Sequence, residues 1–142
     1  MAVIDGVERA SRVRGRVVAI LGVLGAGHGV AGLWALATPL VFYEGSPLPV
    51  LPPYNEHLVR DLGALNLALA VMLVGAALRA DRATVRLAAI AVLAAAVPHA
   101  AYHVVNLSQF PLVDALTQTV GAVVHIALLA VVLALSGRLE ER

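Results

Sequence analysis

Two histidines lie four residues apart in one of the most apolar stretches of the chain, PHAAYH, which contains His99 and His103. Residues i and i+4 share one face of a helix, so these two rings could bind one metal ion together. A second stretch, EHLVRD, supplies another histidine and two carboxylates. Ligands of nitrogen and oxygen without sulfur suit Zn²⁺, Fe²⁺ or Mn²⁺. We therefore predict a metal site, redox-active or otherwise metal-dependent, whose ligands are Glu56, His57, Asp61, His99 and His103.

The same residue types also permit acid–base chemistry without a cofactor. A histidine and a carboxylate in a pocket of low dielectric constant can exchange a proton with a substrate, here with Asp61 and His103 as the catalytic pair. Further side chains could bind the head group of a lipophilic small molecule: Tyr54, Arg60, Tyr102 and Gln118. This alternative predicts a membrane enzyme or a proton relay.

Two other interpretations stay open. Histidines on different helices at one depth can ligate the iron of a b-type haem, and the candidates for this role are His28, His99 and His125. Alternatively, the polar side chains only form hydrogen bonds between helices. In that case the chain is a non-catalytic accessory subunit of a larger membrane complex.

The composition places these residues inside a membrane. Hydrophobic residues make up 61% of the chain and charged residues only 13%, against about half and about a quarter in soluble domains. Four long runs contain no charged side chain, at residues 17–43, 62–78, 87–107 and 115–136, and a membrane-spanning helix needs about 20 apolar residues. We predict an all-α integral membrane protein with a single membrane domain, residues 1–142, and transmembrane helices at 17–40, 57–79, 85–107 and 112–136.

The distribution of positive charge predicts the orientation. Nine of the ten arginines flank the first helix, the connection between helices two and three, or the end of helix four, and the chain has no lysine. The connections at 44–56 and 108–111 contain neither residue. Because cytoplasmic loops are enriched in positive charge, we expect a multi-pass protein of the cell membrane with both termini in the cytoplasm. The short connections favour an up-down-up-down four-helix bundle. The first apolar run is too long for a typical signal peptide, so we expect it to be retained.

A rise of 1.5 Å per residue sorts the polar side chains into two depth layers. The outer layer contains His57, Asp61, His103 and Gln118, and the mid-membrane layer contains His28, His99 and His125. The i, i+4 spacing gives three helices one polar stripe each, and the simplest packing turns all three stripes inward. Asn66 lies on the opposite face from His57, where we expect it to form a hydrogen bond between helices. Pro98 should kink its helix and aim His99 and His103 toward the second and fourth helices.

Small residues indicate how the first helix packs. One broad face carries Gly22, Gly25, Gly29 and Gly32, and two of these form a G-x-x-x-G motif. Such faces let helix backbones approach closely. The partner is either a neighbouring helix of the same chain or a second copy in a homo-oligomer.

The layout resembles the small four-helix membrane proteins grouped as DoxX-like. The shared features are a short chain, both ends inside, and the segment RDLGALNLALAV that opens the second helix. This group includes a subunit associated with thiosulfate:quinone oxidoreduction, and the resemblance implies the topology. The absence of cysteine and lysine excludes thiol chemistry, disulfides, iron–sulfur clusters and Schiff-base chemistry. The arginines sit at helix ends, so we expect membrane lipids as partners and no nucleic acid.

Overall fold

The computed structural model describes residues 2–46 and 53–140, and every regular element in them is helical. The elements are α1 (Ala2–Ala37), α2 (Pro39–Gly45), α3 (Glu56–Arg79), α4 (Arg82–Val105), the short 3₁₀ helix η1 (Leu107–Gln109) and α5 (Leu112–Ser136). Part of the predicted connection at 44–56, residues 47–52, and Arg142 lie outside the described residues.

Four of these helices are long and apolar enough to cross a membrane: Glu8–Ala37, Glu56–Arg79, Arg82–Val105 and Leu112–Ser136. They also expose large apolar side chains, for example Val30, Val71 and Leu78, which are 66%, 68% and 78% exposed. Extensive apolar exposure on a single chain is typical of a surface that contacts lipid or another protein. The all-helical expectation is confirmed for the described residues, and four of the helices could span a membrane, as predicted.

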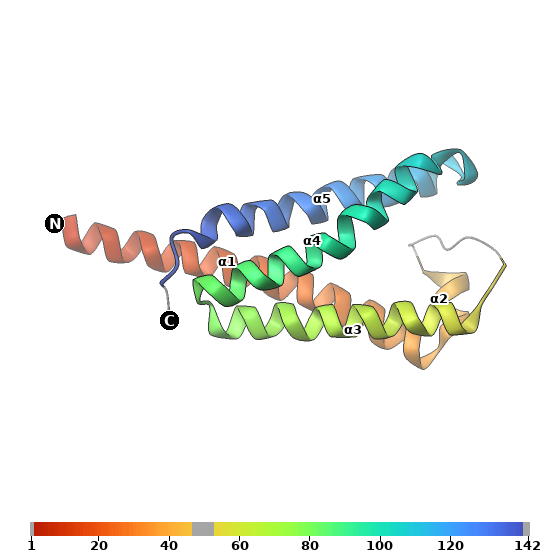
Figure 1. Cartoon of the computed structure of the whole chain (residues 1–142), viewed down its shortest axis with the longest axis horizontal. Helices are drawn as coiled ribbons and strands as arrows, with labels where there is room; N and C mark the ends of the chain where they lie inside the picture. Colours follow the sequence, from red (N-terminus) through yellow and green to blue (C-terminus); the bar gives the residue numbers. More distant parts are fainter. Residues whose placement is uncertain (1, 47–52, 141–142) are drawn as a thin grey trace.

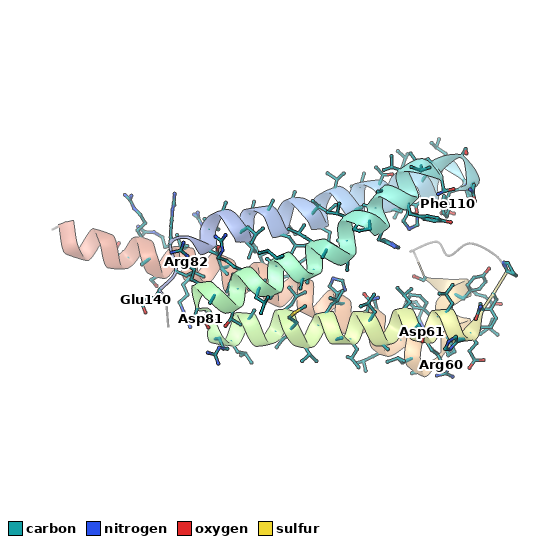
Figure 2. The ribbon with its side chains drawn as sticks, viewed as in Figure 1. Arg60, Asp61, Asp81, Arg82, Phe110 and Glu140 are labelled. Carbon is teal, nitrogen blue, oxygen red and sulfur yellow. The ribbon has the colours of Figure 1, made fainter. Side chains whose placement is uncertain are left out.

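The four long helices form two pairs. α1 packs mainly against α3, and α4 packs mainly against α5 (Figure 1). The pairs meet near Asp81, Arg82 and Glu140, which we call the basic end, and diverge toward Arg60, Asp61 and Phe110, which we call the distal end (Figure 2). The largest apolar core joins both pairs and includes Leu21, Leu73, Val92 and Leu129, all fully buried.

Glycines bring α1 and α3 into backbone contact. A Cβ atom added at Gly32 would lie 2.8 Å from the backbone nitrogen of Leu67 and 2.9 Å from the carbonyl oxygen of Gly63. One added at Gly25 would lie 2.9 Å from a methyl group of Val74. Without side chains in the way, the two helices pack at the short distance that small residues permit. Of the two partners considered for the glycine face, the structure shows a helix of the same chain at Gly25, Gly29 and Gly32, whereas an added Cβ at Gly22 would meet nothing within 4 Å.

The first helix differs at both ends from the predicted 17–40. It begins at Ala2, where its arginine-rich segment is helical and carries an i, i+4 ion pair of 3.2 Å between Arg12 and Glu8. It stops at Ala37 because the next residue, Thr38, precedes a proline, and that position disfavours helical angles. The short helix α2 then turns back, and its Phe42 packs edge-on against Trp34 with ring centroids 5.4 Å apart.

Asp81 organises the tight turn between α3 and α4. Ala80 adopts the left-handed conformation, with φ 50°, and Asp81 caps α4. Its carboxylate accepts hydrogen bonds from the backbone N–H of Thr84 at 2.9 Å, the Thr84 hydroxyl at 2.8 Å and Arg79 Nε at 3.1 Å. These bonds, with the Thr84 backbone bond the largest contribution, lower the Asp81 pKa from 3.8 to about 2. The turn therefore holds a negative charge at neutral pH.

This cap predicts an acid-sensitive stability. The folded carboxylate binds a proton less readily than the unfolded one, so its stabilisation is complete above about pH 4 and is lost as the pH falls toward 2. Replacing Asp81 with alanine should lower the thermal unfolding midpoint at neutral pH and flatten its decline between about pH 4 and pH 2. Circular dichroism in uncharged detergent measures both. A Glu8→Ala control should keep the wild-type slope, and an Asp81→Ala curve parallel to wild type would contradict this role.

Candidate functional site

A chain of hydrogen bonds links three helices between the two helix pairs. His28 Nδ1 lies 2.7 Å from Asn66 Oδ1, which joins α1 to α3. His28 Nε2 lies 3.4 Å from His125 Nε2, which joins α1 to α5. The two imidazole rings are tilted by 57° with centroids 5.1 Å apart. All three side chains are partly buried within the predicted spans.

The hydrogen-bond partners assign the protons. Asn66 Nδ2 donates to the carbonyl of Leu62 at 2.8 Å, which turns Oδ1 toward His28. An amide oxygen only accepts, so His28 Nδ1 carries a proton and, in the neutral ring, Nε2 is the acceptor. The proton between the two rings then belongs to His125 Nε2. The neutral site is an ordered chain that runs from His125 through His28 and Asn66 to the Leu62 carbonyl.

The glycine-lined contact between α1 and α3, which we call the glycine seam, makes this chain of hydrogen bonds possible. Gly29 follows His28 directly and faces Ala70. A Cβ atom added at Gly29 would lie 3.7 Å from the Cβ of Ala70. One turn farther along, a Cβ atom added at Gly32 would lie 2.9 Å from the carbonyl oxygen of Gly63 and 3.3 Å from the carbonyl carbon of Asn66, both in the backbone of α3. Because α1 and α3 are this close, the short side chain of Asn66 reaches the ring of His28.

Only two of the three predicted haem ligands come together. His28 and His125 are paired, whereas His99 lies on α4 and pairs with His103. The Nε2 atoms of His28 and His125 face each other directly, and a porphyrin needs its iron between two axial nitrogens. Haem binding therefore stays a prediction that requires the helices to separate.

His99 and His103 form the expected i, i+4 pair, with their Nε2 atoms 3.1 Å apart. His103 also stacks near Phe110, with ring centroids 5.5 Å apart, and near Tyr102, at 5.8 Å. His99 is exposed on this single chain. The two rings lie side by side on α4, toward the distal end.

The carboxylate half of the predicted metal site lies elsewhere. His57 Nε2 and Asp61 Oδ2 are 3.4 Å apart on α3, and their side chains are 87% and 62% exposed. Glu56 instead pairs with Arg60 at 2.8 Å. Within the described residues, no three side chains of His, Cys, Asp or Glu gather closely enough to hold a metal ion.

We predicted that the three polar stripes all face inward and meet at one site. They do not meet in this structure, so that prediction is wrong. α3 and α4 are adjacent at the basic end and diverge away from it, so that α4 runs beside α5 toward the distal end (Figure 1). His99 and His103 follow α4, while His57 and Asp61 stay with α3 in the other helix pair. Pro98 lies within α4, but the two groups remain on different helix pairs.

The predicted substrate-binding residues have separate environments. Tyr54 packs against Tyr43 with centroids 5.2 Å apart, and partial burial followed by the charge of Glu56 raises the pKa of its hydroxyl. Arg60 donates to the carbonyl of Leu36 at 2.6 Å and so caps the end of α1. Tyr102 is 52% exposed. Gln118 is buried, and its amide has no hydrogen-bond partner among the described residues.

Sequence reasoning underestimated Asn66, for which it expected only a contact between helices. The available signal was its spacing, because Asn66 lies three residues after Gly63 and faces the glycine side of α1.

No family model, curated protein or solved structure matches the chain.

Proposed function

We propose that this chain is a small membrane protein that relays protons through His28 and His125. In this proposal the four long helices cross the cell membrane in an up-down-up-down order. Both termini lie in the cytoplasm, because the arginines cluster at the basic end. The distal end then faces the outside.

The observation that carries the proposal is the 3.4 Å contact between His28 and His125, which continues to Asn66. Ionisable side chains inside a membrane are costly and commonly mark proton or substrate pathways. Histidine is the side chain whose charge changes most readily near neutral pH. Here two of them share one hydrogen bond across the two helix pairs.

The chain of donors and acceptors defines the transfer. A proton that binds His125 at Nδ1 makes that ring an imidazolium, which passes its Nε2 proton to Nε2 of His28. The positive charge then sits on His28, whose Nδ1–H donates to Asn66 in a charge-assisted bond. His125 is left neutral with its proton on Nδ1. One proton has thus been taken up, and one positive charge has moved from α5 to α1.

The packing beside this site gives the relay a direction. Toward the basic end the four helices close around Leu21, Leu73, Leu129 and Val132, which are fully buried and apolar. These side chains offer a proton no further acceptor. The relay therefore exchanges protons with the distal side or with a lipophilic reactant in the membrane, rather than conducting them from face to face.

A pH titration of the histidine rings tests this proposal. In ¹⁵N-histidine-labelled protein in lipid nanodiscs, His28 and His125 should bind protons in two separate steps, because the first proton is shared and the second meets a neighbouring positive charge. In the His28→Gln variant, His125 should titrate in one step. His57→Gln is the control and should leave the two-step behaviour intact. Independent single-step titration of both rings in the wild type would contradict the relay.

A second function, metal binding, is favoured by the two close ring nitrogens of His99 and His103. Zinc–nitrogen bonds of about 2.0–2.1 Å in a tetrahedral site place two nitrogens about 3.4 Å apart, and the two Nε2 atoms lie 3.1 Å apart. We propose that Zn²⁺ or a similar ion binds these rings, with its other ligands supplied by water or by another molecule.

Cobalt binding tests this second function. The wild-type protein should bind Co²⁺, a spectroscopic substitute for Zn²⁺, and either His99→Ala or His103→Ala should weaken binding about tenfold or more because one of two ligands is lost. Visible absorption in uncharged detergent measures the affinity. The control is His57→Ala, which should bind like wild type. Equal affinities in all four proteins would contradict a metal clamp at this place.

A further inference from the structure

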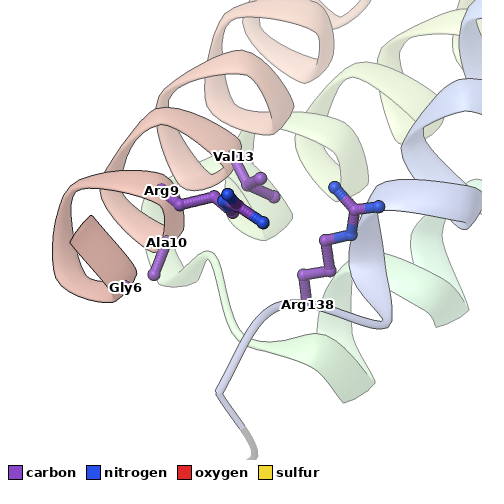
Figure 3. A pocket seen from close by; sticks show the side chains of 5 residues that line it. All are labelled: Gly6, Arg9, Ala10, Val13 and Arg138. Carbon is purple, nitrogen blue, oxygen red and sulfur yellow. The ribbon is translucent and has the colours of Figure 1, made fainter. Parts of the chain in front are cut away.

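A cavity at the basic end lies between the start of α1 and the end of α5. Its volume is about 200 Å³, and it is lined by Gly6, Arg9, Ala10, Val13 and Arg138. This is several times the roughly 30 Å³ that one water molecule occupies in the liquid. Figure 3 shows Arg9 and Arg138 on opposite sides of this space, Arg9 on α1 and Arg138 on the segment that follows α5.

Arg9 and Arg138 form no ion pair among the described residues, whereas two other arginines at this end do. Arg12 pairs with Glu8 at 3.2 Å, and Arg79 pairs with Asp81 at 3.1 Å. Arg9 and Arg138 therefore place two positive charges at the edge of one cavity. Two cations facing each other repel unless an anion lies between them.

The chain holds Arg138 in position through its backbone. After α5 the N–H of Arg138 donates to Leu135 at 3.0 Å, and Leu139 is buried beside the core. The carbonyl of Glu140 then accepts from the N–H of Arg82 at 3.0 Å, which ties this segment to the start of α4. Arg138 thus projects from a fixed turn.

We propose that this cavity binds a phosphate ester, namely the head group of an anionic phospholipid. Arg9 lies at the start of the first candidate span and Arg138 lies two residues beyond α5, so both stand at the level of the lipid head groups. Guanidinium groups bind phosphate oxygens through paired hydrogen bonds. Val13, which is 4% exposed, gives the cavity an apolar side toward the membrane. Basic pockets between membrane helices are known to take such head groups.

Native mass spectrometry in uncharged detergent tests the proposal with dioleoylphosphatidylglycerol as the probe. The double variant Arg9→Gln/Arg138→Gln should bind it about 30-fold more weakly than wild type, from about 1 kcal/mol for each arginine. The matched control, Arg14→Gln/Arg86→Gln, removes two arginines that do not line the cavity and should change the affinity less than about threefold. Arg9→Lys/Arg138→Lys keeps both charges but loses the paired hydrogen bonds, so its affinity should fall between those of wild type and the glutamine double variant.

Two further arms identify the ligand. Dioleoylphosphatidylcholine, which has no net charge, should bind more weakly than the phosphatidylglycerol, and inorganic phosphate should not displace the lipid. Equal losses in both glutamine double variants, or equal binding of the two lipids, would overturn the proposal. Binding of inorganic phosphate without binding of phosphatidylglycerol would overturn the lipid and assign the cavity to a soluble phosphate.

Discussion

Replacing Gly32 with alanine is expected to destabilise the protein by about 2–3 kcal/mol. The new Cβ would lie 2.8 Å from the Leu67 nitrogen and 2.9 Å from the Gly63 oxygen. Both are backbone atoms of α3, so neither can turn aside as a flexible side chain could. The two helices would have to separate along the seam that also positions His28 beside Asn66.

The measurement is unfolding of the protein in mixed micelles by a denaturing detergent. Gly27→Ala is the matched control on the same helix, because an added Cβ there meets nothing within 4 Å. That variant should be unchanged or more stable by up to about 1 kcal/mol, since alanine favours helix over glycine. If Gly32→Ala proved as stable as Gly27→Ala, the α1–α3 seam would be refuted.

Replacing Asn66 with leucine should have the second largest effect, a loss of about 1–2 kcal/mol in stability together with the loss of ordered protonation at His28. Leucine has a similar size but accepts no hydrogen bond, so the Nδ1–H of His28 would lose its 2.7 Å partner. The His28 ring would then be free to exchange between its two neutral forms. Its 3.4 Å contact with His125 would no longer have a fixed donor.

The same nanodisc titration detects this change, and the two-step protonation of the histidine pair should disappear. Asn106→Leu serves as control, because it removes an asparagine that bonds to Tyr102 and Gln109 at the distal end of α4. This control should leave the His28 and His125 spectra unaltered. An unchanged His28 signal in Asn66→Leu would show that the amide does not hold the ring.

The helices themselves followed from the sequence. Uncharged runs of membrane-spanning length predicted the four long helices, and the glycines of the first helix predicted close packing against another helix, without deciding between this chain and a second copy. Both inferences depend on local properties, hydrophobic length and side-chain size. The end of α1 at Ala37 was also local, because Pro39 follows within two residues, but the prediction ran through that proline to residue 40.

The composition of the site did not follow from the sequence. Depth along each helix placed His57, Asp61 and His103 in one outer layer, but depth does not fix the angle between helices. The divergence of the two helix pairs separates α3 from α4 at the distal end, where these residues lie (Figure 1). Nearer the middle the pairs are still in contact, and there His28 and His125 meet. Which layer assembles thus depends on tertiary packing.

The most direct test of the relay is the position of the proton on each ring. It is read from the ¹⁵N chemical shifts of the protein in lipid nanodiscs, at a pH where both rings are neutral. We expect His28 to carry its proton on Nδ1 with a bare Nε2, and His125 to carry its proton on Nε2, as the contacts to Asn66 and between the rings require. A His28 ring protonated at Nε2 with a bare Nδ1 would contradict the ordered chain and, with it, the proposed relay.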